Sequence, residues 1–144
     1  MKPKESVLKL VKLAIIDFDF ETIIPEKEEK LPDISLDVDF DIYQNEDKKG
    51  VYKIELIIKG NKEKRIPGYS FSTHAVGIFS YPTEITEKEG KQLIQFSGLP
   101  IVINYVRNYL INLTSYGAFG QYTMPTFDIR DLFQQKKASI NKTT

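Results

Sequence analysis

The 144-residue sequence contains no cysteine and a single histidine, His74. The lack of cysteine excludes disulfide bonds, thiolate catalysis and zinc sites built from cysteine. One histidine cannot form a histidine-rich metal site within a single chain. The sequence therefore predicts neither a bound metal ion nor any other cofactor.

Net charge and long apolar segments are absent as well. Twenty Lys and Arg balance twenty Asp and Glu, so the formal charge of zero favours neither nucleic acid nor an anionic membrane as a partner. Lys9 and Lys12 interrupt the apolar N-terminal stretch, and no run of about 18 apolar residues occurs. We therefore expect a cytoplasmic protein that does not insert into membranes.

The first two thirds of the sequence show the two-residue periodicity of half-buried antiparallel strands. Four segments are predicted strands: residues 15–21, 34–44, 51–59 and 69–80. In the second of them, the apolar Phe40 and Ile42 alternate with aspartates, which predicts one apolar and one exposed face. Residues 25–33 form a polar crossover between the first two strands.

After Pro82 the periodicity changes to that of helices. Residues 87–96 and 100–116 are predicted helices, with a break or a kink at the Gly-Leu-Pro of residues 98–100. Gly117 is placed to end the second helix in a left-handed conformation. Asp128 is predicted to cap a short helix through Phe133, before a flexible polar tail at about 134–144. Strands followed by helices predict a single α+β domain over residues 1–144, with the helices covering one face of the sheet.

Two sequence patterns hint at chemistry but fit structural roles better. Residues 37–48 begin like a calcium loop, but Ile42 stands where the loop needs glycine and Lys48 where it needs glutamate. Strand alternation instead places these aspartates on an exposed face. His74 shares a strand face with two serines but has no third catalytic group, so we expect a binding protein rather than an enzyme.

Residues 117–133 raise a different question, because they combine apolar side chains with Gly, Pro and polar spacers. The apolar residues include Phe119, Tyr122, Met124 and Phe127. In the simpler interpretation they fill the core between helix and sheet. The spacers, however, are typical of an adaptable surface, and Met and aromatic side chains suit apolar recognition without a fixed hydrogen-bonding pattern.

Residues 98–133 resemble the C-terminal half of the SecB protein-export chaperone family. The resemblance consists of a Pro-led helix ending in Gly-Xaa-Phe, an apolar loop, and Pro-Xaa-Phe-Asp before an apolar helix start. The matching residues are Pro100, Gly117, Phe119, Pro125, Phe127, Asp128, Leu132 and Phe133. Residues 76–81 are similar to the end of the family's last strand, and the first and third predicted strands fit its order. The resemblance covers nearly the whole chain.

This resemblance implies a SecB-like fold and a homo-tetramer, a dimer of dimers built through the long helix. It also implies an ATP-independent holdase that binds unfolded or non-native polypeptides in apolar grooves and serves protein export. By position, the peptide-binding residues are Phe40, Ile42, Tyr105, Phe119, Tyr122, Met124 and Phe127. Docking on a SecA-type translocase motor would use an acidic sheet surface, to which Asp17 and Glu21 belong.

The chain departs from the family where the motor binds. Ser70 and Ser72 replace a leucine and a glutamate on the last strand, the chain is neutral rather than strongly acidic, and its tail is basic. The motor partnership therefore stays open. The alternative to a general holdase is a dedicated partner or chaperone of one client, such as a toxin–antitoxin component.

Overall fold

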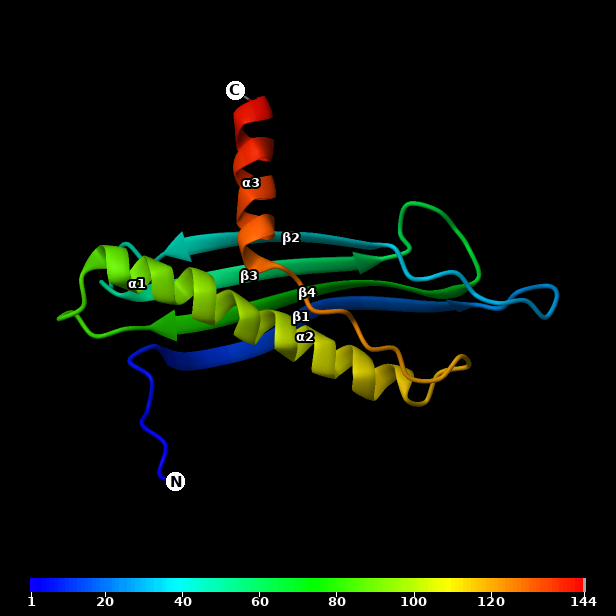
Figure 1. Cartoon of the computed structure of the whole chain (residues 1–144), viewed down its shortest axis with the longest axis horizontal. Coiled ribbons are helices and arrows are strands. Elements are labelled where there is room, and N and C mark those ends of the chain that lie inside the picture. The colour runs from blue at the N-terminus through cyan, green and yellow to red at the C-terminus, as the bar shows by residue number, and fades with distance from the viewer. Residues whose placement is uncertain (144) are drawn as a thin grey trace.

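The computed structural model describes the backbone of residues 1–143 and the side chains of residues 1–137. It confirms a four-stranded antiparallel sheet followed by helices (Figure 1). The elements are β1 (Lys9–Ile23), β2 (Leu36–Gln44), β3 (Val51–Gly60), β4 (Gly68–Ser80), α1 (Glu87–Leu93), the π-helical turn η1 (Ile94–Gly98), α2 (Leu99–Thr114) and α3 (Ile129–Thr143). In the described part of the chain, no helix is both long and apolar enough to cross a bilayer.

The strand order β1-β4-β3-β2 makes β1 and β2 the two edges of the sheet. The connection between them, residues 24–35, therefore crosses from one edge to the other (Figure 1). Pairing of Phe40 with Leu56 and of Ile42 with Ile54 puts the apolar side chains of β2 and β3 on one face, here called the inner face. The aspartates of β2 lie on the opposite, outer face, as the alternation predicts.

Helix α2 covers the inner face of the sheet (Figure 1). The side of α2 that faces the strands is an apolar stripe, which includes the fully buried Val102, Val106 and Leu110. Gly77 permits this close packing, because a Cβ atom there would lie only 2.6 Å from Cγ2 of Val102.

Of the predicted break or kink at residues 98–100, the break does not occur. The chain stays helical from α1 through η1 into α2. Pro100 falls in the first turn of α2, where its missing N–H would have had no partner within the helix.

Gly117 does not have the predicted left-handed conformation, which Gly120 has instead, with φ of 78°. Gly117 serves a different purpose, because a Cβ atom there would overlap the hydroxyl group of Tyr69. The residue is small because the end of α2 lies directly on that side chain.

The predicted end of the last helix at Phe133 is also wrong, because α3 continues to Thr143. Its start is as predicted: the backbone N–H of Asp131 donates to Oδ1 of Asp128 at 3.1 Å, which is an N-terminal cap. Residues 134–137 are Gln and Lys, which have good helix propensity, and no Gly or Pro stops the helix.

Candidate apolar binding groove

The loop between α2 and α3 is held in place by polar contacts with its surroundings. Arg107 of α2 donates through Nε to the carbonyl of Met124 at 3.0 Å and through Nη2 to that of Pro125 at 2.7 Å. The Tyr69 hydroxyl donates to the carbonyl of Gly120 at 2.7 Å. These bonds satisfy loop carbonyls that no regular element pairs, so the loop has a defined path.

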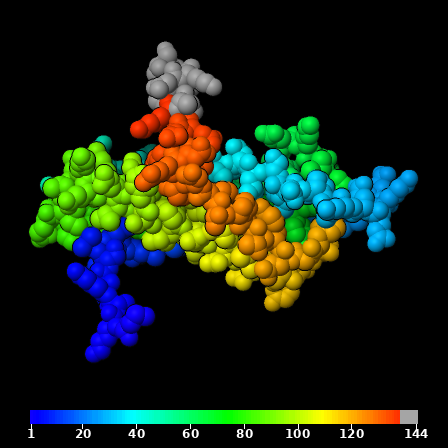
Figure 2. All heavy atoms as spheres, viewed as in Figure 1, coloured from blue at the N-terminus to red at the C-terminus, as the bar shows by residue number. Residues whose placement is uncertain are grey.

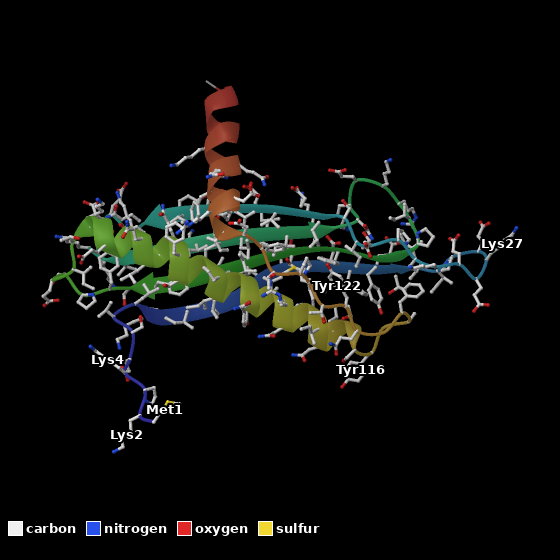
Figure 3. The ribbon with its side chains drawn as sticks, viewed as in Figure 1. Met1, Lys2, Lys4, Lys27, Tyr116 and Tyr122 are labelled. Carbon is white, nitrogen blue, oxygen red and sulfur yellow. The ribbon has the colours of Figure 1, made fainter. Side chains whose placement is uncertain are left out.

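Four of the predicted peptide-binding residues lie in this loop, and three of them, Phe119, Tyr122 and Met124, pack inward. The rings of Phe119 and Tyr69 are 5.4 Å apart, and those of Tyr122 and Phe71 are 6.0 Å apart. Burial raises the pKa of Tyr122 above its ordinary value. Met124 is 1% exposed and belongs to the core. By contrast, Tyr116 is 95% exposed and points away from the molecule (Figure 3).

A second group of apolar residues lines the inner face of β2 where the end of the loop and the start of α3 cross it (Figure 1). We call this surface the β2 groove. Its apolar residues are Leu36, Val38, Phe40, Ile42, Phe127, Leu132 and Phe133. All but Phe40 are only partly buried. The loop and α3 form one continuous surface with β2 on this side (Figure 2).

Two hollows open in the β2 groove. One, of about 310 Å³, is lined by Leu36, Val38, Phe127 and Leu132. The other, of about 250 Å³, lies near the end of β2 and has Ile42 among its lining residues. Polar side chains line both hollows as well: Asp37, Thr126, Asp128, Asp131 and Gln135 in the first, and Gln44, Lys91 and Gln95 in the second.

Phe133 lies at the centre of the β2 groove. Its ring centroid is 5.0 Å from that of Phe40 in an edge-on arrangement and 5.7 Å from that of Phe96 in η1. Phe40 is 6% exposed, whereas Phe96 is 48% exposed. The rings of Phe40 in β2, Phe133 in α3 and Phe96 in η1 therefore form a row of aromatic contacts from the core to the surface.

Charged groups of β2 and α3 meet at the free edge of the sheet. Nζ of Lys136 lies 2.8 Å from Oδ1 of Asp39 and 3.2 Å from Oδ1 of Asp41. The hydrogen bond to Asp39 raises the pKa of Lys136 above its ordinary value. This ion pair fastens α3 to the outer side of the strand whose inner side carries the groove.

Tyr105 does not lie with the other predicted residues. Tyr109, one turn further along α2, packs edge-on against Phe18 of β1 with 4.9 Å between ring centroids. Residues four apart share a helix face, so Tyr105 lies toward the β1 side of α2. Arg107 faces the loop on the opposite side. The seven predicted residues thus fall into three places. Phe119, Tyr122 and Met124 pack inward from the loop, Phe40, Ile42 and Phe127 line the β2 groove, and Tyr105 lies on the β1 side of α2.

The predicted peptide-binding residues do not include Leu36, Val38, Phe96, Leu132 or Phe133. The signal for α3 was present in the spacing of Ile129, Leu132, Phe133 and Lys136, which is one helical stripe. The predicted helix end at Phe133 leaves Lys136 outside the helix, so that prediction does not contain the whole stripe. No local pattern reveals Phe96, because its direction depends on the π-helical turn.

The acidic residues predicted to bind a motor lie on β1 among the chain's own cations. Glu21 Oε1 is 2.6 Å from Arg65 Nη2, and this contact lowers the pKa of Glu21. Asp19 Oδ1 is 2.5 Å from Lys62 Nζ. Asp17 accepts a hydrogen bond from the backbone N–H of Phe18 at 3.0 Å. The loop between β3 and β4 therefore covers part of this acidic stripe.

The chain thus combines an open four-stranded sheet, a helix on its inner face and an apolar groove along one edge strand. The sequence matches the family described as preprotein translocase subunit SecB over residues 2–140. The chain belongs to the SecB family. No curated protein matches the chain in sequence.

Solved structures with a similar fold include the SecB-like chaperone Rv1957 of Mycobacterium tuberculosis, in complex with a ChAD peptide from the Rv1956 HigA1 antitoxin. The identity is 13%, the TM-score is 0.58, and the match covers 84% of this chain and 91% of that one. A protein of unknown function from Streptococcus agalactiae has a TM-score of 0.46 at 13% identity, with 83% and 97% covered. The first match supports the SecB-like fold.

Proposed function

We propose that this protein is an ATP-independent holdase that binds unfolded polypeptides through the β2 groove. The observation that carries the proposal is a half-exposed apolar surface along an edge strand, next to two hollows whose lining includes side chains of that surface. Apolar burial needs no nucleotide and no sequence-specific hydrogen bonds. The peptide bound to the SecB-like chaperone of M. tuberculosis supports polypeptide as the ligand class.

The test is binding of a permanently unfolded polypeptide, with reduced and alkylated cysteines, by the full chain and by two matched variants. Val38→Asn places an amide in the groove, whereas Val51→Asn makes the same change on the outer face of β3, where Val51 is also half-buried. We expect Val38→Asn to weaken binding at least about fivefold, because an apolar side chain of the client would then bury an amide group that has no hydrogen-bond partner. Equal binding by both variants would place the site elsewhere.

A dedicated chaperone of one client is the second candidate function. Phe133 and Leu132 fill part of the β2 groove, which leaves room for selected side chains rather than for any apolar segment. A dedicated chaperone would bind one client tightly and ignore an unrelated unfolded chain. A competition experiment distinguishes the candidates. An unrelated unfolded chain should displace the client from a general holdase but not from a dedicated chaperone.

A homo-tetramer, as a dimer of dimers, forms part of the proposal. Arg107 is the one charged residue between Leu99 and Thr114, so the exposed side of α2 is uncharged. At the free edge of β1, Leu10, Val11 and Ile16 are between 49% and 61% exposed. Uncharged helix surface and an apolar strand edge are typical of subunit contacts.

A role in export through a SecA-type motor has less support. A cationic motor surface would have to displace Arg65 from Glu21 and Lys62 from Asp19. Such exposed pairs are individually weak, but they cancel the local field that would attract a basic partner. The proposal therefore places the protein in the cytoplasm as a chaperone without requiring a motor.

A further inference from the structure

Helix α3 is attached to the rest of the molecule by one stripe of its surface. Ile129, Leu132, Phe133 and Lys136 are partly buried, whereas the intervening residues that the structure describes are exposed. The spacing i, i+3, i+4, i+7 is that of an amphipathic helix lying in a groove. Beyond this stripe the ribbon of α3 extends away from the sheet (Figure 1).

The stripe occupies the apolar surface assigned above to a polypeptide. Phe133 covers Phe40, and Leu132 forms a wall of the hollow that also contains Leu36 and Val38. A client side chain on the centre of β2 would have to take the position that Phe133 holds. The two occupants therefore exclude each other at this point.

The attachment is of a kind that can be released. Its polar part, Lys136 with Asp39 and Asp41, is open to solvent, because the two carboxylate side chains are 61% and 51% exposed. Exposed ion pairs are weak and are screened by salt. The preceding loop is anchored by Arg107 as far as Pro125, so only residues 126–128 need to rotate for α3 to leave.

We propose that α3 is an internal competitor of polypeptide clients, held over the β2 groove by Phe133 and by the ion pair of Lys136 with Asp39 and Asp41. This inference rests on the proposed function. Client binding requires α3 to leave the groove, so the measured affinity equals the affinity of the open groove multiplied by the fraction of open molecules. Weakening the attachment of α3 strengthens client binding.

The first test compares Lys136→Gln with Lys137→Gln in the full chain, using the same permanently unfolded polypeptide. Both variants lose one positive charge from neighbouring residues of α3, but Lys137 is exposed and makes no ion pair among the described residues. We expect Lys136→Gln to bind about two- to fivefold more tightly than Lys137→Gln.

The second test uses Phe133→Ala and distinguishes competition from participation. If α3 competes, removal of the ring increases affinity about five- to tenfold. If α3 instead forms a wall of the site, the same change weakens binding. Hydrogen exchange of the amides of residues 129–137 provides an independent measurement: a bound client should reduce their protection.

The outcomes separate this inference from the proposed function. Tighter binding by Lys136→Gln and Phe133→Ala, with faster exchange in α3, supports both. Binding that is unchanged or weaker in these variants overturns the competitor role and leaves the holdase standing. Absence of binding by every variant, including those with a loosened α3, overturns both.

Discussion

At Met124 the aromatic-rich loop becomes part of the core. The side chain is 1% exposed although the residues on either side, Thr123 and Pro125, are exposed. The carbonyl of Met124 accepts from Arg107, so backbone and side chain are both fixed. A residue that resembles a groove residue in sequence thus contributes to stability, and its role in client binding stays a prediction.

We expect Met124→Ala to lower the free energy of unfolding by about 2–5 kcal/mol, because it leaves a cavity in a packed core. Urea denaturation followed by circular dichroism measures the change. The neighbouring exposed Thr123→Ala should change stability by no more than about 0.5 kcal/mol. A similar small loss for both variants would mean that Met124 lies at the surface in solution.

The guanidinium group of Arg107 anchors the loop between α2 and α3. It donates to two loop carbonyls at once, which a lysine ammonium on a different stem cannot reproduce. Arg107→Lys should cost about 1–3 kcal/mol of unfolding free energy in urea denaturation. Arg130→Lys is the control, since Arg130 is an exposed residue of α3. Equal stability of the two variants would contradict the anchoring role.

At the scale of elements, the sequence predicts the strands better than the site. Alternation in β2 predicts that Phe40 faces inward and Asp39 outward, because period two is imposed by the strand itself. It cannot predict that Phe40 is covered by Phe133, since that contact depends on the path of a distant helix. The sequence does not predict where α3 ends, because the polar second half of this helix has no apolar periodicity.

The ion pair between Arg65, in the β3–β4 loop, and Glu21 of β1 makes the stability of the fold depend on pH in a defined direction. The contact with Arg65 lowers the pKa of Glu21 below its ordinary value of 4.5 in the folded protein. The pair therefore stabilises the fold above the pKa of the unfolded state, and this contribution is lost as the pH falls through the lowered pKa.

Melting curves of the full chain and of Arg65→Gln should consequently differ slightly at pH 7 and converge in acid. Lys64→Gln removes the adjacent positive charge, and Lys64 makes no ion pair among the described residues, so it should not show this convergence. A difference between wild type and Arg65→Gln that grows as the pH falls would contradict the assigned pair.

At the scale of the whole molecule, the uncharged exposed side of α2 bears on assembly. Ile101 is 37% exposed near the start of α2 and would be covered in the proposed tetramer. Ile101→Glu should shift the sedimentation of the protein toward a smaller species, because burying an unpaired carboxylate is costly. Ile24→Glu, in the crossover between β1 and β2, should sediment like the wild type. Identical assembly of both variants would exclude α2 from the interface.

The central claim is that the protein captures non-native polypeptide by burying apolar surface. Isothermal titration calorimetry of the full chain with a permanently unfolded polypeptide, at two temperatures, tests it most directly. We expect binding with a clearly negative heat-capacity change, since apolar burial has that signature. Absence of binding, or binding whose enthalpy does not change with temperature, would contradict it.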